Sequence, residues 1–561
     1  MRYIKEVLKK NRIWILAYVG LGIFNSFMAN YKADYFQKVI DGLADRTLAV
    51  SGIAIYGGIL VVNYCMNYLE QYPEKKLEHG IYLDFKLLSL QKISTIDYTE
   101  YQKIGTGKLV QRIENGSSAG RNVLFDFWLC LIRELIPTIA FSVYFIWKID
   151  KKITYALLVG YAVIFIITNI LLKFLYQIKE KILNSEELFN HYLVRGYMEM
   201  LVFRMSKQFP SEIKKTCNAK EDIVSSKVKM NMIHEAFFTI FALLVAMLDI
   251  GILFYAWKTK NLTVGSVVAL IALIENAYTP IAIFNVLYVQ YKLDKASYKR
   301  FEEFLGLKDD VQLRNGNAIN TNVGKISIRN LSFQYEERKI IDGLSLSIQK
   351  GEKIAFVGES GSGKSTLIKI LLGLLKYNQG EVRLGDMELK EICLNNLYDR
   401  VSYLSQDAPV FDGTIKENLV FEKQVSEEQM LGALSEVQLS HLVENLAEGL
   451  NTEIGEKGTC LSGGEKQRLA LARLWFEDSE LVILDEATSA MDNLTEENVM
   501  KSVMQKMKDK TVIAIAHRLN SIAGFDRIIL FKEGRIVGQG TFEELLHTDS
   551  YFMDLYNANV K

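Results

Sequence analysis

The sequence predicts a membrane all-α domain of six transmembrane helices followed by an α/β domain. The first half of the 561 residues contains long apolar runs, whereas the second half alternates short apolar runs with helical stretches. A chain of this length is also expected to form at least two domains. The predicted boundaries are 1–307 for the membrane domain, 308–323 for a linker and 324–561 for the α/β domain.

Six apolar segments are each long enough, at about 20 residues, to cross a hydrocarbon core of roughly 30 Å. Asn63 and Asn67 interrupt the second segment, and Arg133 and Glu134 interrupt the third. The alternative is a set of buried soluble helices, but a chain of this size has too little interior to bury so many. The predicted spans are 13–35, 51–70, 127–148, 153–177, 234–258 and 264–290.

The loops between these spans alternate in length. Three loops are short, at 36–50, 149–152 and 259–263, and two are long and rich in Lys, Arg and Glu, at 71–126 and 178–233. A long loop folded as a hairpin would carry two helices roughly 40 Å beyond the membrane, at about 1.5 Å per residue. Because the number of spans is even, both long loops, the N-terminus and the α/β domain lie on one side.

Basic residues near the N-terminus indicate which side this is. Lys and Arg are enriched on the cytoplasmic side of membrane proteins. The predicted cytoplasmic segment before the first span contains Lys5, Lys9, Lys10 and Arg12.

Within the predicted spans, Asp249 and Glu275 lie in apolar surroundings, as do Arg133 and Glu134. A charge at the centre of a bilayer costs about 2.5–3.5 kcal/mol on insertion scales. We therefore expect these side chains to face a cavity or a partner, and both substrate contact and pairing between subunits remain open. Pro280 interrupts the sixth span and is expected to kink it.

The overall composition excludes some classes of function. The formal net charge is zero, so bulk electrostatics gives no support to binding of nucleic acid. The five cysteines are scattered, and none is paired at metal-ligand spacing. This usage fits a reducing compartment and argues against a disulfide framework or a zinc site.

The α/β domain is predicted from short strand-like runs that begin at Lys325. KISIRNLSFQY alternates apolar and polar residues, and KIAFVG, LVILDE and TVIAIAH are apolar throughout. Continuous apolar runs of this length are typical of strands buried in a parallel sheet. Before them, residues 291–307 are predicted to extend the last span as a helix, and the polar linker follows.

One stretch, GESGSGKST, has the form G-x-x-x-x-G-K-S between a buried strand and a helix. This is the context that a phosphate-binding loop requires. The glycines let backbone N–H groups turn toward phosphate oxygens, and the helix N-terminus adds positive potential. Lys364 is expected to reach β- and γ-phosphates, and Ser365 to ligate Mg²⁺.

Two acids end the apolar strand LVILDE. Asp485 and Glu486 would be costly at this place unless they are used. Asp485 suits the shell of a Mg²⁺ ion, and Glu486 suits the polarisation of an attacking water. The alternative is a pair of solvated residues at a strand end. His517 ends another apolar strand, and the residues alone leave a structural and a catalytic role equally open.

The stretch LSGGEKQRLALAR (461–473) begins a helix. Ser462 is a favourable N-cap, and Glu465 stands three residues later, so the pair predicts a capping box. Taken alone, the residues favour this structural role.

In their order along the chain, these motifs resemble an ATP-binding cassette (ABC) exporter half-transporter, with six spans fused to one nucleotide-binding domain. The resemblance implies that Tyr335 in LSFQY stacks on adenine and that Gln406 in YLSQD senses Mg²⁺. It also implies that TEIGEKG (452–458) contacts the long hairpins and that SAMD (489–492) is exchanged between subunits. LSGGE would be the family signature.

The resemblance assigns a role to each candidate residue of the nucleotide site. Glu486, His517 and Lys364 would be catalytic, and Ser365, Gln406 and Asp485 would hold Mg²⁺. In the second subunit, the signature would contact the γ-phosphate through Ser462, Gly463, Gly464 and Glu465. The phosphate loop would comprise Gly358, Glu359, Ser360, Gly361, Ser362, Gly363, Lys364, Ser365 and Thr366.

The chain departs from many members of the family at Glu465, where Gln is common. A carboxylate near phosphate is unfavourable unless it turns toward Lys466, Arg468 or the backbone. The hairpin tips at 97–104 and 198–205 are expected to dock on nucleotide-binding domains as coupling helices.

The resemblance also implies cofactors, partners and location. The cofactors are ATP and Mg²⁺, and the partner is a second half-transporter in a homodimer or heterodimer, within the lipid bilayer of the plasma membrane. The exported substrate is a peptide, a lipid or an amphiphilic drug, and no nucleic acid is bound. Two alternatives are an exporter-fold importer of a siderophore-like molecule and a soluble cassette ATPase acting on DNA.

Overall fold

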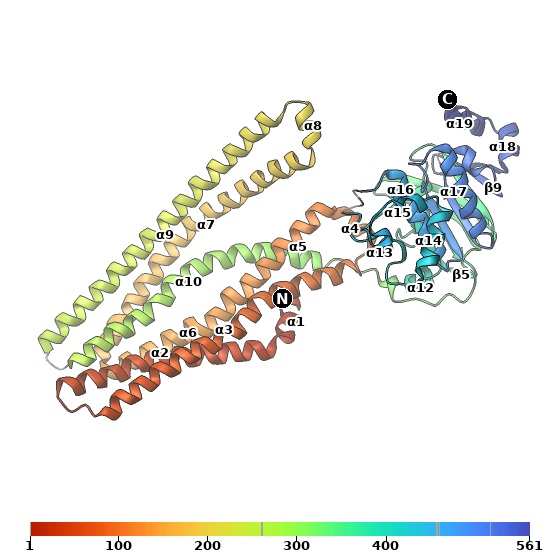
Figure 1. Cartoon of the computed structure of the whole chain (residues 1–561). Coiled ribbons are helices and arrows are strands. Elements are labelled where there is room, and N and C mark those ends of the chain that lie inside the picture. The colour runs from red at the N-terminus through yellow and green to blue at the C-terminus, as the bar shows by residue number, and fades with distance from the viewer. Residues whose placement is uncertain (1, 260–261, 456–457, 459, 517, 561) are drawn as a thin grey trace. The chain divides into compact units, whose positions relative to one another are not determined.

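The chain divides into two compact units, which are described separately (Figure 1). The first comprises Met1–Ser94 and Ile104–Leu307, and the second comprises Thr95–Lys103 and Lys308–Lys561. The residues that the computed structural model describes are 2–259, 262–455, 458, 460–516 and 518–560.

The first unit consists of long helices. Between α5 and α6 the backbone is π-helical in η1 (Asn122–Leu129) and η2 (Leu131–Leu135). The α-helices are α1 (Arg2–Lys10), α2 (Arg12–Ala44), α3 (Val50–Ile93), α5 (Thr106–Arg121), α6 (Ile136–Ile149), α7 (Lys151–Met198), α8 (Met200–Met205), α9 (Phe209–Thr259) and α10 (Val264–Leu305).

Five helical segments among the described residues are long and apolar enough to cross a membrane. They are Arg12–Ala44, Val50–Ile93, Lys108–Ile149, Phe209–Thr259 and Val264–Leu305. The remaining predicted span, 153–177, lies within α7, where several side chains fall outside the described set. These helices are longer than the predicted spans because the two long loops are themselves helical and continue them.

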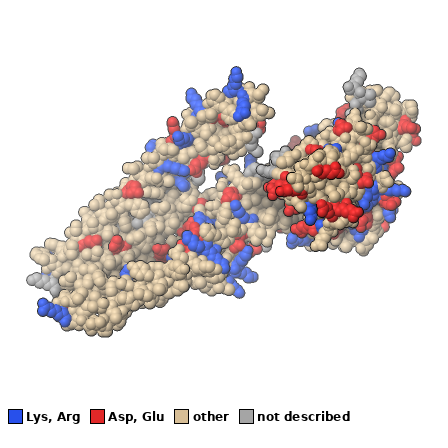
Figure 2. All heavy atoms as spheres, viewed as in Figure 1, with Lys and Arg blue, Asp and Glu red and all other residues tan. Residues whose placement is uncertain are grey.

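Packing in the first unit follows the hairpins. Helices α7 and α9 lie side by side and are joined at one end by α8 (Figure 1). The apolar core includes Phe145, Leu157, Leu270 and Tyr278. On the face shown in Figure 2, long stretches of this unit carry few Lys, Arg, Asp or Glu residues, whereas these residues crowd the second unit. A surface with so few charges suits a lipid environment.

The second unit contains a six-stranded sheet in the order β10-β9-β3-β8-β7-β6. All neighbours in it are parallel except β10 and β9. Its strands are β3 (Lys353–Gly358), β6 (Val401–Leu404), β7 (Leu481–Asp485), β8 (Thr511–Ile515), β9 (Arg527–Lys532) and β10 (Arg535–Gly540). Strands β3, β7 and β8 lie within the runs KIAFVG, LVILDE and TVIAIAH, which confirms the prediction of buried parallel strands, and the three are adjacent in the sheet.

Side chains of these strands alternate between two cores. Ala355 and Val357 of β3 belong to one core, and Ile354 and Phe356 belong to the other. This alternation is the period of two that a strand imposes. Both faces of the sheet are buried, which explains why the sequence shows continuous apolar runs.

The second unit also has a four-stranded antiparallel sheet in the order β2-β1-β4-β5, of which only the first strand is predicted. Its strands are β1 (Ile326–Tyr335), β2 (Arg338–Ile348), β4 (Gln379–Leu384) and β5 (Met387–Glu388). The helices are α11 (Lys364–Leu371), α12 (Leu394–Tyr398), α13 (Ile415–Val420), α14 (Glu427–Glu436), α15 (Ser440–Glu444), α16 (Gly463–Ala472), α17 (Asn493–Lys506), α18 (Phe542–Thr548) and α19 (Ser550–Val560). Short 3₁₀ turns are η3 (Val311–Leu313), η4 (Leu389–Glu391), η5 (Gly449–Asn451), η7 (Arg473–Phe476) and η8 (Leu519–Ile522).

Helix α4 (Tyr98–Ile104) connects α3 to α5, yet most of it belongs to the second unit. The backbone N–H of Asp97 donates to the carbonyl of Lys308 at 3.0 Å, and that of Asp310 donates to Thr95 at 2.7 Å. The ring of Tyr98 packs against the apolar core of the second unit. The first hairpin tip therefore contacts the α/β unit. The tip at 198–205 lies in the first unit, and its docking stays a prediction.

Candidate nucleotide-binding site

The loop between β3 and α11 has the backbone that a bound phosphate needs. Gly358, Gly361 and Gly363 have φ angles of 151°, 81° and 105°, a region that favours glycine. A Cβ atom at Gly358 would overlap the carbonyl oxygen of Phe531. Gly363 is the N-cap of α11, so the loop leads directly into a helix N-terminus with positive potential.

Lys364 folds back over this loop. Its Nζ donates to the carbonyl oxygens of Gly358 and Glu359 at 2.7 and 2.8 Å and to Ser362 Oγ at 3.2 Å. The residue is only 6% exposed. Burial lowers the pKa of Lys364, and the charges of nearby carboxylates, first that of Glu486, act in the opposite direction. A phosphate in the loop would give this ammonium a charged partner in place of neutral ones.

Asp485 and Ser365 come together beside the loop. Asp485 ends β7 and is 7% exposed. Burial raises the pKa of Asp485, the charge of Glu486 adds to the rise, and hydrogen bonds from Tyr403 and Ser365 oppose it. Tyr403 Oη lies 3.4 Å from Asp485 Oδ2. The sequence of YLSQD assigns no role to Tyr403, because this contact arises from the pairing of β6 with β7.

A hydroxyl and a carboxylate are the kind of oxygen ligands that Mg²⁺ prefers. Among the described residues, no group of three or more His, Cys, Asp and Glu side chains could hold a metal ion. A Mg²⁺ ion at Ser365 and Asp485, with Gln406 as the third predicted ligand, would therefore take its other ligands from phosphate oxygens and water, as Mg²⁺ usually does in such sites. The residues present fit that ion.

Glu486 follows Asp485 and contacts Gln406. The Nε2 of Gln406 donates to Glu486 Oε2 at 2.7 Å. The backbone of Glu486 has a φ of 52°, which is uncommon for a residue other than glycine. Strained backbone of this kind tends to occur at functional sites. The two residues predicted to act on Mg²⁺ and on water are thus direct neighbours.

Tyr335 lies at the end of β1, near the phosphate loop. Its ring meets that of Phe333 edge-on, with 5.0 Å between ring centroids. Burial raises the pKa of Tyr335, and a hydrogen bond with the side chain of Thr366 opposes the rise. The residue is 39% exposed, so part of the ring is open to a stacking partner.

The signature segment forms the predicted capping box at the start of α16. The N–H of Glu465 donates to Ser462 Oγ at 3.3 Å, and the N–H of Ser462 donates to Glu465 Oε2 at 2.7 Å. The hydrogen bond from the Ser462 hydroxyl lowers the pKa of Glu465 most. The carboxylate therefore turns toward the backbone, one of the orientations that the resemblance requires.

The signature helix also holds the SAMD segment of its own chain. The Nε2 of Gln467 donates to Ser489 Oγ at 3.0 Å, and its Oε1 accepts from the N–H of Ala490 at 2.8 Å. A Cβ atom at Gly464 would lie 3.0 Å from the carbonyl oxygen of Ala490, and one at Gly463 would lie 3.4 Å from its Cβ. The glycines thus allow close packing of two segments that are both predicted to face a second subunit.

Some predicted residues cannot be placed. His517 lies outside the described residues, as do two positions of TEIGEKG, and their roles stay predictions. The described part of TEIGEKG is anchored by Ile454, whose N–H donates to the carbonyl of Gly413 at 3.0 Å.

Comparison with known proteins points in one direction. Residues 341–489 match the family model described as ABC transporter. An ATP-dependent lipid A-core flippase of Alcanivorax borkumensis is 26% identical over 567 residues, covering 97% of this chain and 94% of that protein. The solved structure of a bacterial Atm1-family ABC exporter with ATP bound has a TM-score of 0.81 at 21% identity and covers 99% of both chains.

Other relatives match over shorter stretches. The uncharacterized ABC transporter ATP-binding protein YwjA of Bacillus subtilis is 34% identical over 301 residues, 53% of this chain and 52% of that protein. A lipid A-core flippase of Francisella tularensis is 38% identical over 42% of this chain, which covers 39% of that flippase. The chain therefore spans about half or less of the length of these two relatives. The structural likeness confirms the predicted fold class, an exporter-type helical domain followed by an ABC nucleotide-binding domain.

Proposed function

The chain belongs to the ABC transporter family and combines the membrane and nucleotide-binding domains of a half-transporter, and from this premise we propose that it hydrolyses ATP to export a substrate. The observation that carries the proposal is the meeting of two hydrogen-bonded pairs and Lys364 near one loop. Gln406 bonds to Glu486, Ser365 bonds to Asp485, and Lys364 lies over the phosphate loop.

Two copies of the nucleotide-binding domain enclose ATP between them. The phosphate loop of one copy holds the phosphates, with Tyr335 against the adenine. Ser462, Gly463 and Gly464 of the second copy meet the γ-phosphate, where the N-terminus of α16 favours an anion. The hydrogen bonds of Gln467 with SAMD support this arrangement, because they hold the signature helix and the SAMD segment together.

The chemistry of hydrolysis is divided among few residues. Glu486 orients and polarises the attacking water, and Gln406 holds the carboxylate of Glu486 in place. Lys364 and His517 stabilise negative charge on the transferred phosphoryl group. Mg²⁺, held by Ser365, Asp485 and Gln406, would neutralise phosphate charge. Loss of the γ-phosphate removes contacts shared by both copies, so the interface weakens.

The second hairpin tip supports a dimer. Helix α8 exposes Leu201, Val202 and Met205, which are 68%, 60% and 76% exposed. Apolar side chains gathered at the end of a hairpin, outside the predicted spans, are unfavourable in water. We propose that the nucleotide-binding domain of the second copy packs against these side chains and covers them. That copy is either an identical chain, in a homodimer, or a related half-transporter, in a heterodimer.

The substrate is proposed only by class, as an amphiphilic peptide, lipid or drug. Long apolar helices argue against the alternative of a soluble ATPase acting on DNA. The direction of transport separates export from siderophore-like import. In inside-out vesicles, an exporter accumulates its substrate when ATP is added, and an importer depletes it.

The test of the proposed chemistry uses the full chain in lipid discs. Glu486→Gln should lower ATP hydrolysis by about 10²–10⁴-fold, the range for loss of a general base, while ATP still draws two nucleotide-binding domains together. Hydrolysis at the wild-type rate would contradict the role of Glu486. Failure of wild-type domains to associate with ATP and Mg²⁺ would contradict the whole proposal.

A further inference from the structure

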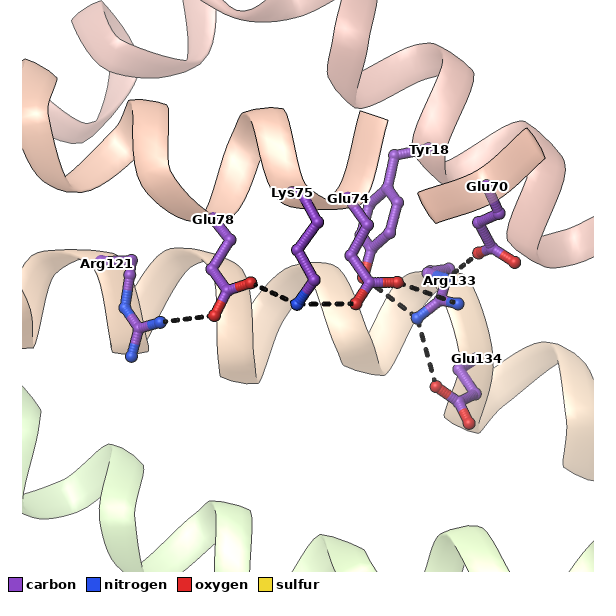
Figure 3. Close-up of polar contacts among 8 residues, drawn as sticks. All are labelled: Tyr18, Glu70, Glu74, Lys75, Glu78, Arg121, Arg133 and Glu134. Atoms are coloured by element: carbon purple, nitrogen blue, oxygen red, sulfur yellow. Dashed lines mark hydrogen bonds and ion pairs between the residues drawn. The ribbon is translucent and has the colours of Figure 1, made fainter. Parts of the chain in front are cut away.

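Arg133 is a half-buried charged side chain that lies where three helices of the first unit meet (Figure 3). Its Nε bonds to Glu70 on α3, and its Nη1 donates to Tyr18 Oη on α2 at 3.0 Å. The side chains of Arg133 and Glu70 are 17% and 4% exposed. The sequence predicts that Arg133 faces a cavity or a partner, and the structure gives it a partner in the same chain.

The surroundings of Arg133 are shaped to hold it. A Cβ atom at Gly22 on α2 would overlap side-chain atoms of Arg133, so only glycine leaves the room that this side chain fills. The guanidinium also lies over the ring of Tyr18, with 4.5 Å from Cζ to the ring centroid. Glu134 lies 3.4 Å from Nη1, and Glu74 lies 3.9 Å from Nη2. Nε and Nη1 therefore have hydrogen-bond acceptors, and Nη2 has a longer ion-pair contact with Glu74.

Further ion pairs cross between the same two hairpin arms. Lys86 of α3 pairs with Glu114 of α5 at 2.7 Å, and Glu78 pairs with Arg121 at 3.4 Å. Together with the bond from Arg133 to Glu70, these contacts form a series of braces along the hairpin, of which Figure 3 draws those of Arg121 and Arg133.

The π-helical stretch keeps the series in register. Twelve positions separate Arg121 from Arg133, whereas eight separate Glu70 from Glu78. A π-helix closes i→i+5 hydrogen bonds and so places more residues in each turn than an α-helix. Because η1 and η2 occupy this stretch, the twelve positions from Arg121 to Arg133 align with the eight positions of α3 from Glu70 to Glu78. Arg133 therefore lies opposite Glu70.

The braced arms, α3 and α5, are the two helices that α4 joins. We propose that Arg133 is a positioning residue of the transport cycle, which binds α2 and the π-helical stretch to the α3 arm. A displacement of α4 on nucleotide binding then moves the three helices as one body. Separating a buried ion pair in an apolar environment is strongly unfavourable, so the helices stay together under load. This inference rests on the proposed function.

The test measures movement rather than hydrolysis. A spin label at Ser51, exposed at the start of α3, reports the distance between two copies in lipid discs, with the native cysteines replaced. Adding ATP and vanadate should change this distance in the wild type. Arg133→Gln should reduce that change to less than half while ATP hydrolysis stays within threefold. Arg133→Lys, which keeps the charge, should recover part of the change.

Lys75 provides a matched control. It belongs to the same charged group, but its ion pairs among the described residues are with Glu74 and Glu78 of its own helix, at 3.9 and 2.8 Å. Lys75→Gln should leave the distance change intact, and an equal loss in this variant would overturn the proposal. The double variant Glu70→Gln with Arg133→Gln avoids leaving one buried charge unpaired.

The double variant therefore guards against misfolding as the cause. If it folds and shows the full wild-type distance change, Arg133 does not couple the helices and the inference is wrong. If the wild type itself shows no change on adding nucleotide, the proposed function fails, and this inference fails with it. The two failures are thus distinguished by the wild-type measurement.

Discussion

Lys364 is a buried cation and Arg133 a half-buried one, and they have partners of different kinds. The ammonium of Lys364 bonds to two backbone carbonyls and a hydroxyl, all uncharged. The guanidinium of Arg133 bonds to the carboxylate of Glu70. A cation with neutral acceptors gains a great deal when an anion arrives, whereas one that already has a carboxylate gains little. The comparison indicates that Lys364 is available to an anionic ligand, whereas Arg133 holds helices of its own chain together.

The largest expected effect comes from removing the cation with neutral partners. Lys364→Ala should lower ATP hydrolysis by at least about 10²–10³-fold, because one donor to the transferred phosphoryl group is lost. Thermal unfolding should change little, since no carboxylate is left without its partner. Hydrolysis rates and melting curves on the same sample check both halves. A large loss of stability with normal hydrolysis would reverse the comparison.

A second variant disturbs the packing around Arg133 and leaves the charge of Arg133 unchanged. Gly22→Ala should destabilise the folded state by about 1–3 kcal/mol, the usual cost of overpacking, because a Cβ atom there overlaps Arg133. Gly20→Ala is the control, since nothing lies within 4 Å of a Cβ atom at that position of the same helix. Both changes bring the same gain in helix propensity. Equal melting temperatures for the two variants would show that Arg133 has room to move.

The smallest expected effect concerns Glu465, whose carboxylate accepts hydrogen bonds from the nearby Ser462. Glu465→Gln should lower the KM for ATP by less than about threefold and cost less than about 1 kcal/mol at pH 7, because exposed charge interactions are screened. The pKa of Glu465 is lowered from 4.5, chiefly by the Ser462 hydroxyl. Its stabilising contribution is therefore present above pH 4.5 and is lost as pH falls through the folded-state pKa.

Unfolding of the wild type and Glu465→Gln at several pH values measures this contribution. The difference in unfolding free energy should shrink toward zero in acid. A difference that grew as pH fell would mean that the carboxylate is protonated in the folded protein, contrary to its hydrogen bonds.

Local patterns explain what the sequence reveals of the fold. Strands β3, β7 and β8 are apolar because both faces are buried, so their runs are readable without a structure. The phosphate loop can also be predicted from the sequence, because its glycines, its lysine and its flanking elements are contiguous. The capping box of Ser462 and Glu465 spans only four residues and was equally predictable.

Distant contacts explain what the sequence conceals. Glu70 lies 63 residues from Arg133, and no spacing rule links them. The π-helical backbone of η1 and η2 carries no motif that separates it from an ordinary apolar helix. Tyr403 and Asp485 meet only because β6 and β7 are adjacent in the sheet. The contact of α4 with the α/β unit was expected from family resemblance, since the residues of the tip alone do not predict it.

The capping box at Ser462 affects the entropy change, and so the affinity, with which two copies associate. Its reciprocal hydrogen bonds order the start of α16 within a single chain. The entropy of arranging those residues is thus lost during folding and does not oppose association later. A partner's phosphate would meet a rigid, preorganised surface, and affinity would depend mainly on how well the two surfaces fit.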